Sequence, residues 1–211
     1  MYTHQKKYIT AGKPIEETNK AILFIHGRGA SAESILTLSE HLDVADFSLF
    51  APQATNNSWY PYSFMAPEVQ NQPALDSAIE ILQELLDSIL AQGVKSENIY
   101  LLGFSQGACL TAEFATRNAQ RYGGLIIFTG GLIGQEINTS RYTGDFAGTP
   151  VLITTGDPDP HVPVSRVNET IKIMEEKGAK IISKIYPRRP HTILPEEIEF
   201  AKSILSTNHS N

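Results

Sequence analysis

Cysteine is almost absent from the sequence, since Cys109 is the only one among 211 residues. No disulfide can therefore form within the chain. Because disulfides are typical of secreted proteins, the sequence predicts a protein of the reducing cytoplasm. Long apolar runs are missing as well. No stretch reaches the roughly 18 residues of a membrane span, and the N-terminus is followed by no signal-peptide core, so stable membrane insertion is not expected.

Positive charge is also in short supply. Seventeen Lys and Arg face 23 Asp and Glu, which gives a formal net charge of −6. Such a chain has no general attraction for nucleic acid, and none is expected as a partner. No Cys/His cluster indicates a metal, although His161 close to Asp157 leaves an incidental metal site open.

Short apolar runs recur along the chain and predict buried strands. They lie at residues 21–25, 47–51, 98–102, 125–128, 151–154 and 180–186. Their apolar residues are continuous rather than alternating, which is typical of strands covered on both faces, as in a parallel sheet.

Amphipathic segments separate these runs. Apolar residues repeat at helical spacing from Leu75 to Ile89 and from Val164 to Met174, and further helices are expected after Ser105 and from Pro195 to Ile204. This alternation predicts an α/β fold with a mostly parallel, doubly wound sheet, helices on both faces and no lid domain. We expect a single domain spanning residues 1–211, with the polar residues 206–211 as a frayed tail.

A candidate nucleophile lies in residues 103–107, Gly-Phe-Ser-Gln-Gly, between a predicted strand and a predicted helix. A sharp turn at this point would hold Ser105 in strained backbone geometry and raise its hydroxyl above the edge of the sheet. The alternative is a strand–helix turn that contains serine and glycine by chance. Cys109 would fall in the helix and is interpreted as a small core residue.

A serine nucleophile needs a base, and the base needs an acid that orients it. His191 follows the last strand at the carboxyl edge of the sheet, where ligands bind in open α/β folds; the alternative is a solvated loop histidine. The loop at 156–163 offers Asp157 and Asp159, of which Asp159 is preferred because it lies further along the loop. His161 is interpreted as a rim residue.

Residues 26–31, His-Gly-Arg-Gly-Ala-Ser, follow the first predicted strand. The glycines on either side of Arg28 allow its backbone N–H to face the serine. Together with the Gln106 N–H it would form an oxyanion hole. His26 is expected to brace this loop. The Arg28 side chain has two interpretations, recognition of an anionic substrate group or simple solvation.

The segment 58–64, Ser-Trp-Tyr-Pro-Tyr-Ser-Phe, is rich in aromatic residues and follows the second predicted strand. Trp59 and Tyr60 are the favoured substrate contacts, as the lining of an acyl or aryl pocket. The alternative is that these rings cover the core beneath a long loop.

Taken together, the motifs at 26–29, 103–108 and 156–163 and the residue His191 resemble those of the phospholipase/carboxylesterase family of small α/β-hydrolases. That family includes acyl-protein thioesterases and bacterial carboxylesterases. The resemblance implies a triad of Ser105, Asp159 and His191 and oxyanion donors at Arg28 and Gln106. Two departures stand out, because the thioesterases typically have leucine at the position of Arg28 and many members have glycine at that of Pro190.

The predicted function is hydrolysis of a small-molecule ester or thioester through an acyl-enzyme, with no metal or organic cofactor. Two alternatives are a dienelactone-hydrolase-like or peptidase activity, and a binding protein that has kept the fold and lost catalysis. A homodimer that hides aromatic surface is left open.

Overall fold

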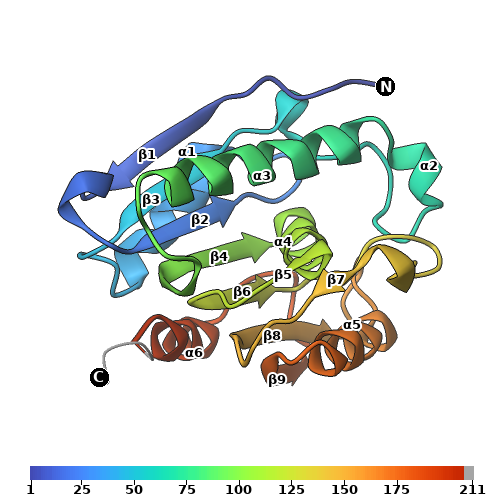
Figure 1. The fold of residues 1–211 in the computed structure, drawn as a ribbon. Helices are drawn as coiled ribbons and strands as arrows, with labels where there is room; N and C mark the ends of the chain where they lie inside the picture. The colour runs from blue at the N-terminus through green and yellow to red at the C-terminus, as the bar shows by residue number, and fades with distance from the viewer. Residues whose placement is uncertain (207–211) are drawn as a thin grey trace.

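The structure, a computed structural model, describes residues 1–206. Its centre is a seven-stranded sheet with the order β1-β3-β2-β4-β6-β8-β9 (Figure 1). The six predicted apolar runs all form strands of this sheet: β2 (Ala21–Ile25), β3 (Ser48–Pro52), β4 (Ile99–Phe104), β6 (Gly124–Phe128), β8 (Pro150–Asp157) and β9 (Lys180–Pro187). They pair in parallel throughout, which confirms the predicted α/β class. Of the expected frayed tail, only Ser206 is described, at the end of the last helix, and 207–211 lie outside the described residues.

One strand of the sheet was not predicted. β1 (Tyr8–Gly12) pairs antiparallel with β3 at the edge of the sheet. Four of its five residues are exposed, so this strand has no apolar run that sequence periodicity would detect. Two further short strands, β5 (Asn118–Ala119) and β7 (Thr143–Gly144), form a separate parallel pair.

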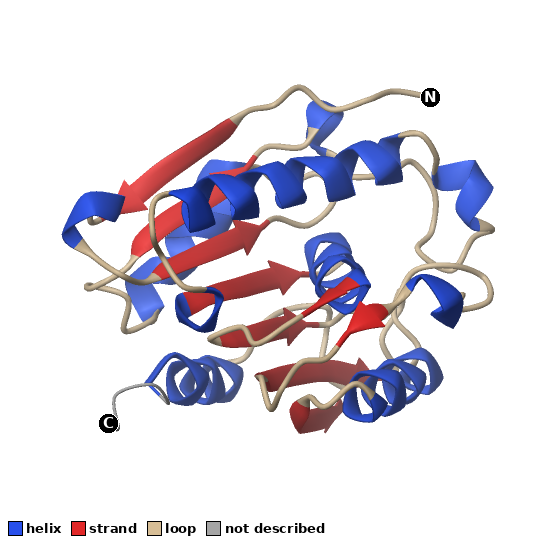
Figure 2. Cartoon of the chain, viewed as in Figure 1, coloured by secondary structure: helices blue, strands red, loops and turns tan. Residues whose placement is uncertain are grey.

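The helices cover both faces of the sheet (Figure 2). They are α1 (Ala32–Leu36), α2 (Glu68–Asn71), α3 (Ala74–Ala91), α4 (Gln106–Arg117), α5 (Val164–Glu176) and α6 (Pro195–Ser206). Short 3-10 turns occupy Ile15–Glu17, Thr37–His41, Thr55–Asn57, Ser96–Asn98 and Thr139–Arg141. The predicted helices correspond to α3, α4, α5 and α6. Among residues 1–206, no helix has the length and apolarity needed to cross a membrane.

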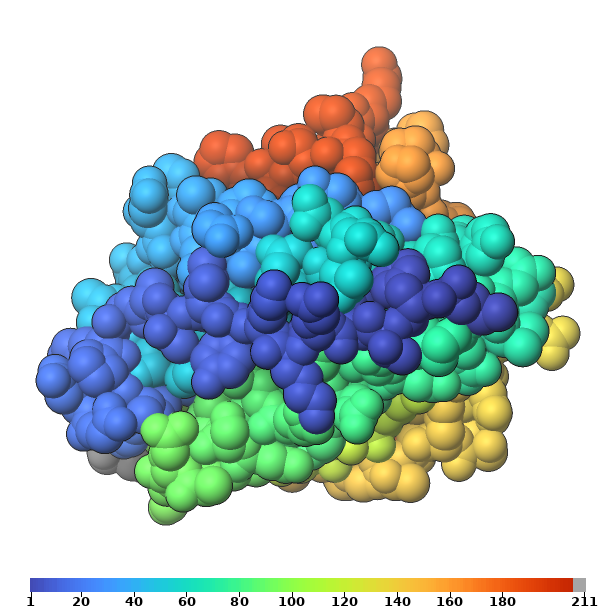
Figure 3. Space-filling view, turned by 90° about the horizontal axis from the view of Figure 1, so that it is seen from above, coloured from blue at the N-terminus to red at the C-terminus, as the bar shows by residue number. Residues whose placement is uncertain are grey.

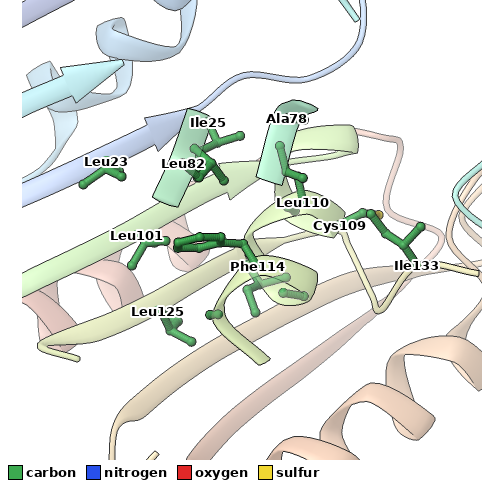
Figure 4. Packing of buried hydrophobic residues seen from close by; sticks show 14 of the residues in the cluster. Leu23, Ile25, Ala78, Leu82, Leu101, Cys109, Leu110, Phe114, Leu125 and Ile133 are labelled. Carbon is green, nitrogen blue, oxygen red and sulfur yellow. The ribbon is translucent and has the colours of Figure 1, made fainter. Parts of the chain in front are cut away.

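Two buried clusters explain how the strands can be apolar on both sides. Alternate residues of β2 point in opposite directions, so that Leu23 and Ile25 belong to a cluster with residues of α3, α4 and α5, whereas Ile22 and Phe24 belong to a cluster with residues of α1 and α6. Figure 4 shows the first cluster, in which Phe114 of α4 lies among buried aliphatic side chains. The sheet is therefore covered on both faces, as its continuous apolarity predicted.

The N-terminal segment is held against the molecule. In the space-filling view the first residues form a dark blue band across one face (Figure 3). His4 is only 9% exposed. Its Nε2 lies 2.9 Å from the Trp59 carbonyl oxygen, and its Nδ1 accepts a hydrogen bond of 3.0 Å from the Thr55 N–H. These contacts tie the start of the chain to the loop after β3.

Replacement of Phe114 by alanine is expected to reduce the free energy of unfolding by about 3–5 kcal/mol, because it leaves a cavity in the main cluster. Phe114 is fully buried, whereas Val69 is 70% exposed, so Val69→Ala is a suitable control. Urea unfolding followed by circular dichroism measures both. Equal midpoints for the two variants would contradict the packing described here.

Candidate active site

The turn between β4 and α4 holds Ser105 in an unusual backbone conformation. Its φ is 56° and its ψ is −119°, which for a residue with a side chain costs about 1–3 kcal/mol. The Ser105 N–H donates to the Phe128 carbonyl oxygen at 3.0 Å, and the Ser105 carbonyl accepts from the Cys109 N–H at 3.0 Å. The turn is thus fixed on one side by β6 and on the other by the first turn of α4.

Two glycines flank this turn because no side chain fits there. A Cβ atom at Gly107 would lie 2.0 Å from the Ile25 carbonyl oxygen, and one at Gly103 would lie 2.3 Å from the Gly107 carbonyl oxygen. Such distances are far below van der Waals contact. The backbone of α4 therefore passes close to the end of β2, as the sequence motif predicted.

The structure brings the three predicted catalytic side chains into one hydrogen-bonded chain. His191 Nε2 lies 2.8 Å from Ser105 Oγ, and His191 Nδ1 lies 2.9 Å from Asp159 Oδ2. The three residues come from the turns after β4, β8 and β9, which meet at the carboxyl edge of the sheet. This is the geometry in which a histidine takes a proton from a serine while a carboxylate orients it.

Asp159 is held so that its carboxylate stays ionised. Its Oδ1 accepts hydrogen bonds of 2.9 Å from the backbone N–H groups of His161 and Val162. Burial acts to raise the pKa of Asp159, but hydrogen bonds from His191 and from these two N–H groups outweigh it, and the pKa lies below its usual value. An ionised carboxylate only accepts, so the His191 proton sits on Nδ1 and Nε2 is free to act as a base.

The predicted oxyanion donors belong to two segments that adjoin Ser105. Gln106 is the first residue of α4, and Gly27 at the end of β2 approaches so closely that a Cβ atom added to it would be 3.5 Å from the Ser105 Cβ. Within residues 1–206, the backbone N–H groups of Arg28 and Gln106 have no hydrogen-bond partner. Free backbone donors are what an oxyanion hole requires.

The side chains of Arg28 and Gln106 both hold the loop after β3. Gln106 Oε1 accepts from the Trp59 N–H at 2.9 Å, and Gln106 Nε2 donates to the Tyr60 carbonyl at 2.8 Å. The Arg28 guanidinium donates to Ser58 Oγ at 3.0 Å and to the carbonyl oxygens of Pro61 at 2.9 Å and of residue 62 at 2.7 Å. These hydrogen bonds hold the segment 58–62 against the loop after β2, residues 26–31, which we call the oxyanion loop, and against the start of α4.

A cavity of about 600 Å³ opens beside Ser105. Its lining includes residues 60–64 from the loop after β3 and residues 160–162 from the loop after β8, together with Gln106 and His191. Tyr60 is one of the lining residues, although it is only 1% exposed and its hydroxyl is buried. A contact between Tyr60 and the substrate stays a prediction.

Trp59 differs from the prediction. Its side chain is fully buried and does not contribute to the cavity wall. Its indole Nε1 donates to the His26 carbonyl oxygen at 2.8 Å, and its ring lies against that of His26 with centroids 4.9 Å apart. Trp59 is a core residue beneath the loop, which is the alternative that the sequence had left open for these aromatic residues.

His26 braces the oxyanion loop, as expected from the sequence. Its Nδ1 donates to the Gly27 carbonyl at 2.7 Å, and its Nε2 accepts from the Ala54 N–H at 3.1 Å. Burial lowers the pKa of His26. The ring is thus held in its neutral form by two backbone partners, which leaves neither nitrogen available as a catalytic base.

A buried ion pair beneath the His191 loop was not found from the sequence. Arg189 and Glu197 lie 3.0 Å apart, with side-chain exposures of 1% and 0%. Glu197 also accepts from the Leu194 N–H at 2.7 Å and from the Thr154 hydroxyl. Arg189 donates to the Thr129 hydroxyl at 2.5 Å. The pair connects the loop that carries His191 to α6 and to the ends of β6 and β8.

Glu197→Gln is expected to reduce the free energy of unfolding by about 3–5 kcal/mol, because it leaves the Arg189 guanidinium buried without a counter-charge. Glu199→Gln on the same helix is the matched control, since that carboxylate is 70% exposed and its ion pair is worth about 0–1 kcal/mol. Chemical denaturation measures both variants. A Glu197→Gln midpoint equal to that of Glu199→Gln would show that the pair does not anchor the loop.

Cys109 lies in α4 with 2% exposure, as the small core residue that was expected. Burial raises the pKa of its thiol to about 12. At pH 8 only about one molecule in ten thousand would then carry the reactive thiolate.

The folded protein should not react with a disulfide reagent such as DTNB until denaturant unfolds it, and iodoacetamide should leave its activity intact. Rapid labelling of the folded chain, with loss of activity, would contradict this.

Metal ligands are not assembled around Asp157 and His161. Within residues 1–206, no group of three or more His, Cys, Asp or Glu side chains is arranged to hold a metal ion. The His161 ring instead packs edge-on against that of His191, with centroids 5.0 Å apart. His161 thus lies at the rim of the cavity, where it had been expected.

Comparison with known proteins points in one direction. The sequence pattern of the phospholipase/carboxylesterase family matches residues 7–209. A crystal structure of a phospholipase/carboxylesterase from Dyadobacter fermentans is 56% identical, with a TM-score of 0.97 over 98% of this chain and 99% of that one.

More distant relatives carry related names. A probable carboxylesterase, SOBER1-like, from Arabidopsis thaliana is 27% identical over 87% of this chain and 77% of its own length. Acyl-protein thioesterase 1 from Saccharomyces cerevisiae is 22% identical over 93% of this chain and 96% of its own length.

Proposed function

The chain belongs to the phospholipase/carboxylesterase family of α/β-hydrolases, and we propose that it hydrolyses carboxylic ester or thioester bonds through an acyl-enzyme on Ser105. The observation that carries this proposal is the hydrogen-bonded chain from Ser105 Oγ through His191 to Asp159. Esterases and thioesterases among its relatives support the same reaction class.

In the first half-reaction Ser105 Oγ attacks the substrate carbonyl carbon, and its proton passes to His191 Nε2. The carbonyl oxygen becomes an oxyanion, which accepts hydrogen bonds from the backbone N–H groups of Arg28 and Gln106. Asp159 stabilises the imidazolium. The bond to the alcohol or thiol then breaks, and His191 returns the proton to this leaving group.

In the second half-reaction water replaces the leaving group. It attacks the acyl carbon while His191 Nε2 takes one of its protons. The bond to Ser105 Oγ breaks, and the proton passes from His191 to the serine. The products are a carboxylic acid and an alcohol or thiol, and no cofactor takes part.

Ser105→Ala should reduce kcat on a 4-nitrophenyl ester by a factor on the order of 10⁴–10⁶, because alanine has no hydroxyl that could attack the carbonyl carbon. Asp159→Asn should reduce it by about 10⁴, since the amide favours the wrong histidine tautomer. Asp157→Asn is the matched control, because this exposed carboxylate lies two residues away and outside the hydrogen-bonded chain. Comparable losses in the two Asn variants would contradict the assignment of Asp159.

Labelling by a fluorophosphonate separates catalysis from binding alone. Wild type should be labelled and Ser105→Ala should not, because only an activated serine reacts. A wild type that hydrolyses no ester and resists the reagent would instead support the alternative of a binding protein that has kept the fold.

We also propose the cytoplasm as the setting of the reaction, because Cys109 is a buried free thiol.

A homodimer is the oligomer that we propose to test. Tyr8 and Tyr62 are 54% and 57% exposed, and a second copy would cover such aromatic surface. Light scattering of the purified protein measures its mass directly.

A further inference from the structure

The catalytic cavity has an unbalanced charge. Of the described residues that line it, Arg28 alone carries a permanent charge, and none is aspartate or glutamate. The protein as a whole carries a formal charge of −6. A positive cavity in an acidic protein is therefore a local feature of this site and does not follow from the composition.

No carboxylate neutralises Arg28. Its hydrogen-bond partners are the Ser58 hydroxyl and the carbonyl oxygens of residues 61 and 62, all of which are neutral. Within residues 1–206, no ion pair to this guanidinium is formed. The carboxylate nearest the reaction, that of Asp159, has both oxygens engaged by His191 and by backbone N–H groups, and its side chain is 0% exposed.

Arg28 also keeps free donors. A guanidinium has five N–H groups. Two on Nη1 and one on Nη2 are used by the loop, which leaves Nε–H and the second N–H of Nη2. The residue is exposed and lies at the cavity wall. Charged donors of this kind bind carboxylates and phosphates more strongly than neutral groups do.

We propose that the enzyme selects esters with an anionic group, such as a carboxylate, close to the scissile bond, and that the Arg28 guanidinium is its receptor. This inference rests on the proposed function, because it names the substrate class of the same site. The competing interpretation is that Arg28 serves only to fasten the loop 58–62, in which case its loss would affect charged and neutral substrates equally.

The test compares esters that differ only in charge. Monoethyl succinate and ethyl levulinate have nearly the same shape, and only the first carries a carboxylate in the acyl part. Acetoxyacetate and acetoxyacetone form the matching pair for the alcohol part. Acid release in a pH-stat at pH 7.5 gives kcat/KM for all four. Wild type should prefer the anionic member of at least one pair, and the pair that responds identifies the side of the ester that faces Arg28.

Arg28→Gln should reduce the ratio of kcat/KM for the anionic ester to that for the neutral ester by about tenfold to a hundredfold, the worth of a charge-assisted hydrogen bond. Arg28→Lys should keep most of the ratio, because the charge remains. Lys95→Gln is the control for net charge, since that side chain is 77% exposed and does not line the cavity. Its ratio should equal that of wild type.

The outcomes separate this inference from the proposed function. Hydrolysis of both members of each pair with equal efficiency, and a ratio that Arg28→Gln leaves unchanged, would overturn the inference while the esterase assignment stands. A wild type that hydrolyses none of the four esters and resists a fluorophosphonate would overturn the proposed function itself.

Discussion

The close approach of α4 to the end of β2 is the constraint on which the site depends. The Gly107 backbone lies against the Ile25 carbonyl, and this contact allows the chain to turn sharply enough to hold Ser105 at a φ of 56°. Hydrogen bonds to β6 and within α4 offset the backbone strain of about 1–3 kcal/mol at this residue. The proposed nucleophile, Ser105, is therefore placed by the central strands themselves, and Gln106 follows it as the first residue of the helix.

The proposed base, His191, and its proposed acid, Asp159, lie on loops that have no comparable support from the sheet, and polar contacts hold each of them. Asp159 is fixed by two backbone N–H groups of its own loop. The loop of His191 rests on the Arg189–Glu197 pair, which is almost entirely buried. Burying an ion pair costs desolvation free energy, and apolar side chains of similar volume often stabilise the folded state equally well. The pair instead fixes the position of the loop, because each of its directional hydrogen bonds holds one point of it.

The elements that depend on a local sequence pattern could be predicted from the sequence. Continuous apolar runs revealed the six parallel strands, and the strand–turn–helix context marked Ser105. β1 was missed, since its exposed residues show no periodicity. Trp59 was misplaced, because a ring that follows a strand can cover the core or line a pocket with the same neighbours in sequence. The Arg189–Glu197 pair left no signal either, since two charged residues eight positions apart meet only once the loop has folded.

Arg28 and Gln106 couple the two tasks of the site. The backbone of each residue has a free N–H, which is the proposed donor for the oxyanion, while its side chain holds the loop 58–62, of which residues 60–62 line the cavity. A change in that lining would therefore act on the same two residues that we propose to stabilise the transition state. Substitutions in this loop should alter kcat together with KM, because the geometry of the oxyanion hole shifts with the lining. The arginine that this chain has at position 28, where the thioesterases typically have leucine, would then affect both substrate choice and the rate of the chemical step.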